Sequence, residues 1–120
     1  MRNVPNLCVT NVSHPTIRFE ENKRTLYFKN PNRNVYRAVQ VDGCAITEGM
    51  RCDKLLTSED EHAEHFVELK GTDIKHAIEQ LQRTIDALGE YNDDRHAYVI
   101  STNVAPALTS KETISNKVSI

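Results

Sequence analysis

The sequence predicts an α/β fold in which one long amphipathic helix packs on a mixed central β-sheet. The chain has 120 residues, the size of one domain. Short β-branched and aromatic runs recur along it, and residues 73–88 carry apolar side chains at helical spacing. Because strand-like runs flank this stretch, we expect the helix to be a crossover between two parallel strands. Residues 1–120 are therefore expected to form a single domain.

The first expected elements are an N-terminal arm and a β-hairpin. Residues 1–15 show no clear periodicity and predict an irregular arm. Residues 16–20 and 25–29 are β-branched or aromatic runs, and the polar residues 21–24 between them are typical of a turn. These runs predict two antiparallel strands.

A third strand and a second hairpin are expected next. Residues 35–41 alternate between two faces and end at an Asp-Gly turn signal. Residues 51–56 and 65–70 are two further strand-like runs, joined by the polar residues 57–64. The pattern predicts that these two runs pair with each other.

The amphipathic helix is expected over residues 73–88. Thr72 or Asp73 can cap its first turn, and Gly89 occupies the position at which a left-handed residue commonly ends a helix. Residues 96–102 then predict a final strand, and the polar residues 105–120 predict a tail. The apolar stripe of the helix consists of Ile74, Ala77, Ile78, Leu81, Ile85 and Leu88.

The charge distribution is more informative than the net charge of -2. Between residues 18 and 37 there are six basic residues and two acidic ones. A segment of this kind is either a solvated strand surface or a patch that faces phosphates. In the second case, the residues expected to contact nucleic acid are Lys23, Arg24, Lys29, Arg33 and Arg37.

The cysteines favour a cytoplasmic protein. Cys8, Cys44 and Cys52 are too few and too irregularly spaced for a disulfide framework. Together with His62 and His65, Cys44 and Cys52 are also candidates for a zinc site, but no paired CxxC motif is present. We interpret these two cysteines as small buried hydrophobic residues. The apolar runs are too short to enter a membrane.

Two carboxylates and an amine are expected to meet on the second hairpin. If its loop is symmetric about residues 60 and 61, Asp53 lies opposite Glu68, and Lys70 shares their face. Two anions at that spacing repel each other in a half-buried sheet unless a cation lies between them. Oxygen ligands suit Mg²⁺ or Mn²⁺, so the sequence predicts a hairpin-borne metal site.

These residues give the chain a family resemblance. Asp53 followed by Glu68-Leu69-Lys70 at the end of a strand, and then by an amphipathic helix, resembles the PD-(D/E)XK nuclease superfamily over residues 39–102. The resemblance implies a restriction-endonuclease-like fold in which Asp53 and Glu68 hold the metal and Lys70 assists the attacking water. Gln80 matches a glutamine that several members carry on the helix, where it contributes to the site.

The sequence departs from the superfamily pattern at three points. Cys52 stands where a proline commonly precedes the aspartate, and Thr84 stands where some branches have a tyrosine. Many members begin with a helix that carries a further glutamate ligand, whereas this chain is expected to begin with an arm and a hairpin. Glu20, Asp42 and Glu48 are candidates to replace that ligand, and we favour Glu48 because it lies only five residues before Asp53.

The resemblance implies a Mg²⁺-dependent DNA endonuclease that hydrolyses phosphodiester bonds with a metal-activated water. The alternative is a nuclease-fold module that binds nucleic acid or protein without cutting. Because a chain of this size carries one site, cutting both strands would require a homodimer or repeated nicking. We expect a homodimer.

Overall fold

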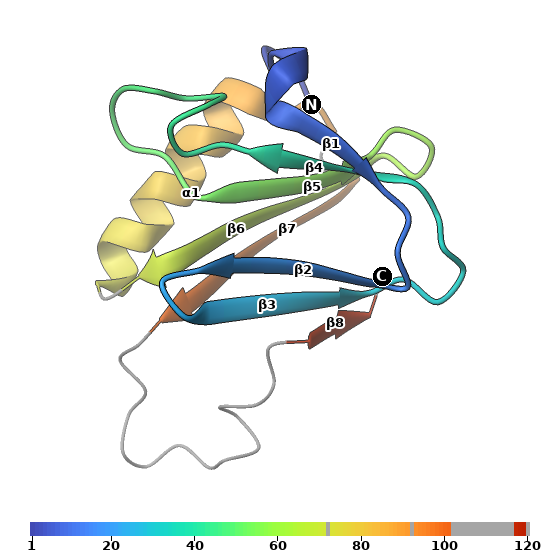
Figure 1. Ribbon diagram of the computed structural model, residues 1–120. Coiled ribbons are helices and arrows are strands. Elements are labelled where there is room, and N and C mark those ends of the chain that lie inside the picture. Colours follow the sequence, from blue (N-terminus) through green and yellow to red (C-terminus); the bar gives the residue numbers. More distant parts are fainter. Residues whose placement is uncertain (72, 92, 102–116, 120) are drawn as a thin grey trace.

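The structure is a computed structural model that describes residues 1–71, 73–91, 93–101 and 117–119 (Figure 1). Its central sheet has five strands in the order β1-β4-β5-β6-β7, and a second sheet has three in the order β2-β3-β8. A short 3-10 helix, η1 (Asn6–Cys8), precedes β1, and the α-helix is α1 (Ile74–Leu88). The strands are β1 (Val9–Val12), β2 (Thr16–Glu21), β3 (Arg24–Lys29), β4 (Tyr36–Gln40), β5 (Lys54–Ser58), β6 (Ala63–Gly71), β7 (Asp94–Ser101) and β8 (Lys117–Ser119).

The predicted mixed sheet with one crossover helix is confirmed. β1, β4, β5 and β6 pair antiparallel, whereas β6 and β7, which α1 connects, pair parallel. The first predicted hairpin also forms, as β2 and β3. It does not extend the central sheet, because its inward side chains pack against that sheet's face. These side chains are Ile17, Phe19, Leu26 and Phe28.

Two terminal predictions were wrong in part. The arm predicted for residues 1–15 contains η1 and β1, and β1 pairs with β4 at the edge of the central sheet. The tail predicted for residues 105–120 contains β8, which pairs parallel with β3. Both strands are short and gain their order from main-chain pairing, for which side-chain periodicity is no guide. Residues 105–116 and 120 lie outside the described residues.

α1 begins and ends as predicted, but its last cap differs from the expectation. The Asp73 side chain accepts a hydrogen bond from the His76 N–H at 3.2 Å, which caps the first turn. Gly89 has φ -67° and is therefore not left-handed. A Cβ at this position would lie 2.6 Å from Nη2 of Arg95 and 2.6 Å from the carbonyl oxygen of Ile85, so lack of space explains the glycine.

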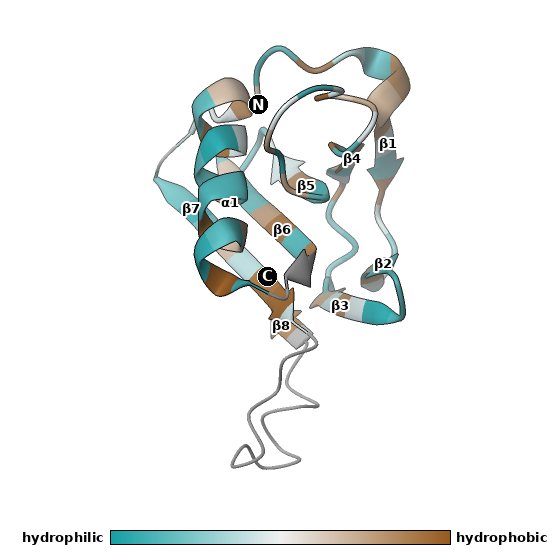
Figure 2. Cartoon of the chain, turned by 90° about the vertical axis from the view of Figure 1, so that its left-hand side faces the viewer, coloured by the Kyte–Doolittle hydropathy of each residue, from teal (hydrophilic) through white to brown (hydrophobic). Residues whose placement is uncertain are grey.

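The central sheet is covered on both faces. On one face, Leu55 and Phe66 pack with Leu81 and Leu88 of α1. On the other face, Leu56 and Val67, the next residues along the same strands, pack against the three-stranded sheet. Figure 2 shows α1 and the β2–β3 hairpin on opposite sides of β5 and β6. Leu69 of β6 belongs to the same apolar layer as Leu56 and Val67, between the two sheets.

Two residues of the predicted apolar stripe are not covered. Ile74 is 49% exposed and Ile78 is 57% exposed, whereas Ala77, Leu81 and Leu88 are buried.

No helix in the described ranges has the length and apolar content needed to cross a membrane.

A disulfide joins Cys8 to Cys44, which contradicts the expectation that the cysteines form no disulfide. The bond ties η1 to the loop after β4, and the sequence separation of 36 residues hides their proximity. Cys52 is free and buried, as predicted. Because Cys44 is bonded to Cys8, it is not available to the zinc site considered from the sequence.

Removing this disulfide should destabilise the fold. The bond closes a loop between residues 36 apart, for which chain entropy gives about 4 kcal/mol. The double variant Cys8→Ser, Cys44→Ser should therefore lose stability of this order in a urea titration. Wild-type protein in dithiothreitol should behave like the variant, while the variant itself should not respond to the reductant. Equal midpoints for oxidised and reduced wild type would contradict the disulfide.

Candidate metal centre

The β5–β6 pairing, continued by one residue beyond its last regular pair, points to Asp53 opposite Glu68, the arrangement that the sequence predicts. Leu55 pairs with Phe66 and Lys54 pairs with Val67, so the pairing is centred between residues 60 and 61. The turn, residues 59–62, is shorter than the predicted loop of residues 57–64. Regular pairing ends at Lys54, and the N–H of Asp53 donates to the carbonyl oxygen of Val67 at 3.0 Å.

The backbone and the carboxylate of Asp53 are both fixed by main-chain contacts. Its carbonyl oxygen accepts hydrogen bonds from the N–H groups of Val41 at 3.0 Å and Asp42 at 3.3 Å. Its Oδ2 accepts from the N–H of Leu69 at 2.7 Å. The carboxylate is thus held against the strand that carries Glu68.

Asp53 and Glu68 are both buried, each with 3% exposure. Burial raises the pKa of the neighbouring Cys52 thiol to about 12, and the negative charges of Glu68 and Asp53 contribute to this rise. Two buried carboxylates in one hairpin are candidates for holding a cation.

β6 is irregular immediately after Glu68. From Glu68 to Gly71 it advances three residues, while its partner β7 advances two, from Val99 to Ser101. One extra residue therefore lies in β6 at this point, as in a β-bulge, which commonly re-aims side chains next to functional sites. Lys70 lies in this part of β6, and its side chain lies outside the described part of the structure.

α1 contacts the segment that leads into Asp53. Gln80 is half-buried, and its Nε2 donates to the carbonyl oxygen of Arg51 at 3.0 Å. Thr84 is fully buried, and its Oγ1 accepts from the N–H of Cys52 at 2.8 Å. The sequence identified Gln80 through the resemblance. The contact of Thr84 went undetected, because a bond to a backbone N–H carries no side-chain signature.

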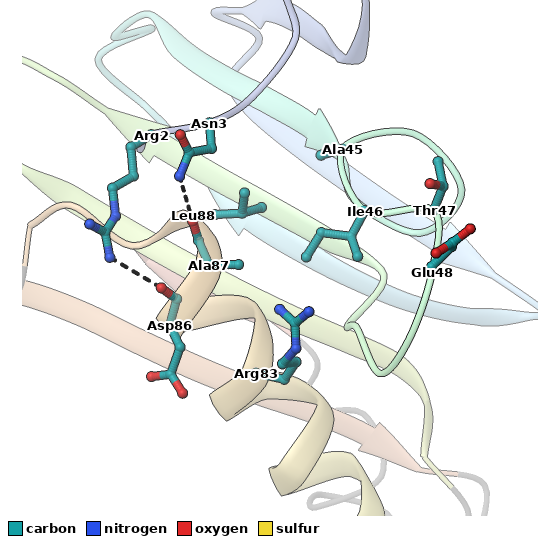
Figure 3. Close-up of a pocket in the computed structure, with 10 residues that line it drawn as sticks. All are labelled: Arg2, Asn3, Ala45, Ile46, Thr47, Glu48, Arg83, Asp86, Ala87 and Leu88. Carbon is teal, nitrogen blue, oxygen red and sulfur yellow. Dashed lines mark hydrogen bonds between the residues drawn. The ribbon is translucent and has the colours of Figure 1, made fainter.

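The third predicted ligand does not join the two carboxylates. Glu48 is exposed and lines a groove of about 520 Å³ between its own loop and the second half of α1 (Figure 3). The other charged side chains of this groove are Arg2, Arg83 and Asp86. Asp53 and Glu68 do not line it.

The two other acidic candidates lie in ion pairs. Oε1 of Glu20 lies 2.7 Å from Nη2 of Arg18, and Oδ1 of Asp42 lies 2.8 Å from Nε of Arg51. Among the described residues, no group of three or more His, Cys, Asp or Glu side chains could hold a metal ion. The described part of the centre therefore consists of Asp53 and Glu68.

The fold divides the predicted phosphate-binding residues between two ends of the molecule. The β2–β3 turn carries Lys23, and an ion pair of 3.3 Å between Lys54 and Glu21 places this turn beside the start of β5. In Figure 1 the turn lies at the left-hand end, near the end of β6. Arg24 belongs to this end, whereas Lys29, Arg33 and Arg37 lie toward the other.

Comparison of the chain with protein-family models, with curated proteins and with solved structures found no match.

A second polar cluster lies on the face of the sheet that carries β2 and β3. Nδ1 of His65 lies 2.9 Å from the hydroxyl of Tyr98, and the His65 ring stacks on that of His96 with centroids 5.0 Å apart. These side chains, with Tyr36 and Asp94, line a cavity of about 280 Å³. Burial lowers the pKa of His65 to about 4, and the neighbouring His96 adds to this decrease.

His65 should make the fold sensitive to mild acid. Its pKa is about 4 in the folded protein, against an ordinary value of 6.5, so the unfolded state binds more protons between these limits and stability falls as pH falls. The decrease from pH 7 to pH 4 should be on the order of 3 kcal/mol. Urea titrations across this range measure it, and His65→Phe should have a shallower pH dependence. Identical pH profiles for wild type and His65→Phe would show that another group is responsible.

Proposed function

We propose that this chain is a divalent-metal-dependent nuclease that hydrolyses phosphodiester bonds in DNA and has a restriction-endonuclease-like fold. The observation that carries the proposal is that Asp53 and Glu68 are both buried, with 3% exposure each, next to the last regular pair at the open end of the β5–β6 hairpin, Lys54 with Val67. Their order along the chain, the Glu-Leu-Lys run and the following helix are those of the PD-(D/E)XK pattern.

The donor set fits a hard cation. Carboxylate oxygens of Asp53 and Glu68 are ligands that Mg²⁺ and Mn²⁺ accept, and neither ion needs a complete shell of protein ligands because both retain waters. A bound ion of this kind lowers the pKa of a water and polarises a phosphodiester. Lys70, two residues after Glu68 in β6, would orient the nucleophile and balance developing negative charge.

Gln80 would act from the helix side of the centre. Its amide reaches the backbone of Arg51, two residues before Asp53, so it helps to define the wall next to the carboxylates. The proposal includes a homodimer, since each chain carries one centre and a duplex has two strands to cut.

A non-catalytic binding module is the second candidate. It is favoured by the position of Glu48, which lines a separate groove. Divalent-ion-dependent cleavage distinguishes the two functions.

Loss of either carboxylate should abolish cleavage. Glu68→Ala and Asp53→Asn each remove a metal ligand, and Lys70→Ala removes the proposed assisting amine. Each should slow nicking of supercoiled DNA in Mg²⁺ by on the order of 100-fold or more. Asp60→Asn is the matched control, because Asp60 is exposed in the turn of the same hairpin. Undiminished cleavage by Glu68→Ala would reject the proposed site, and no cleavage by wild type would favour the binding module.

The two ends of β3 should contribute unequally to DNA binding. Lys23 and Arg24 lie at the end of the molecule where β5 begins, whereas Lys29 and Arg33 lie toward the opposite end of the strand. Lys23→Ala with Arg24→Ala should reduce the slope of log affinity against log salt by about 0.9 for each phosphate that the variant no longer binds. Lys29→Ala with Arg33→Ala serves as the comparison and should leave the slope nearly unchanged. Equal effects of the two pairs would show that DNA does not bind preferentially at the end where β5 begins.

A further inference from the structure

Thr84 makes the most buried polar contact between α1 and the candidate metal centre. The side chain has 0% exposure in the third turn of the helix. Its Oγ1 donates to the carbonyl oxygen of Gln80 at 2.9 Å and accepts from the N–H of Cys52 at 2.8 Å. The hydroxyl therefore links the helix backbone directly to the residue before Asp53.

A valine of the same shape could not replace this contact. The N–H of Cys52 is buried under the helix, and a buried donor without a partner is costly. The backbone at residues 51–52 would have to move to find another partner. Because Asp53 is the next residue, any such movement would reach its carboxylate first.

Other hydrogen bonds also fix the backbone on either side of Cys52. Gln80 holds the carbonyl oxygen of Arg51, and the N–H groups of Val41 and Asp42 hold that of Asp53. Asp53 is thus fixed from the sheet side by main-chain bonds and from the helix side through Thr84. Of the two contacts from α1, the one to Cys52 depends on a single hydroxyl.

We propose that Thr84 is a positioning residue for Asp53, which sets the affinity of the centre for its divalent ion by fixing the backbone of Cys52. This inference rests on the proposed metal-dependent function. Thr84 would not touch the ion or the substrate. Its effect on both would pass through the placement of the Asp53 carboxylate.

The test compares three variants with wild type. Thr84→Val removes the hydroxyl and keeps the shape, while Thr84→Ser keeps the hydroxyl. Thr57→Val is the matched control, because Thr57 is equally buried and its Oγ1 donates to the carbonyl oxygen of Ala63 at 2.8 Å, at the far end of the same hairpin. The readout is Mn²⁺ affinity by calorimetry, at a temperature where circular dichroism shows each variant folded.

The expected result is a decrease in Mn²⁺ affinity of about tenfold or more in Thr84→Val, with near wild-type affinity in Thr84→Ser and Thr57→Val. Equal affinities in Thr84→Val and Thr57→Val would overturn the positioning role. Failure of the proposed function is a separate outcome. In that case wild type would bind Mn²⁺ no more tightly than the Asp53→Asn and Glu68→Ala variants do.

A second measurement needs no variant. Coupling between two sites is reciprocal, so if the Thr84 contact strengthens metal binding, bound Mg²⁺ must strengthen the contact. Exchange of the Cys52 amide hydrogen in wild type should therefore slow when Mg²⁺ is added, by a larger factor than exchange at Leu56 in the same hairpin. Equal slowing at the two amides would reflect general stabilisation and would contradict the proposal.

Discussion

The register of the β5–β6 hairpin is the constraint on which the rest of the structure depends. Side chains alternate along a strand, so a slip of one residue would exchange the two faces. Leu55 and Phe66 would then leave the helix side, and Leu56 and Val67 would leave the three-stranded sheet. Both faces of this hairpin are covered, so a slip would disrupt two apolar layers at once. Asp53 and Glu68 flank the last regular pair of this hairpin, Lys54 with Val67, so their placement also depends on this register.

Covering both faces also determines the electrostatics of the centre. A hairpin with one solvated face would leave its carboxylates in water, where their mutual repulsion is small. Here α1 packs over one face and the second sheet over the other, so Asp53 and Glu68 have 3% exposure. The proposed affinity for a divalent ion follows from this burial together with the ligand chemistry. The packing that stabilises the hairpin therefore also removes two carboxylates from bulk water.

The sequence predicted elements whose order is visible in side-chain patterns. The strand over residues 35–41, the helix over residues 73–88 and the register of the second hairpin were predicted correctly. Apolar burial determines all three. β1, β8 and the Cys8–Cys44 disulfide were missed, because main-chain pairing and a contact across 36 residues leave no local pattern. Gly89 was assigned the wrong reason, since the Arg95 side chain that crowds it is brought there by the fold.

Some residues of the candidate site could be predicted from the sequence, and others could not. Its carboxylates were predictable because they follow from the register, whereas Thr84 was not, because it bonds a backbone N–H that almost any residue at position 52 would offer. The basic residues show a further limit of sequence reasoning. They form one cluster along the chain, yet a strand of six residues separates them into two groups. Lys23 and Arg24 lie at the end of the molecule where β5 begins, whereas Lys29, Arg33 and Arg37 lie toward the other end.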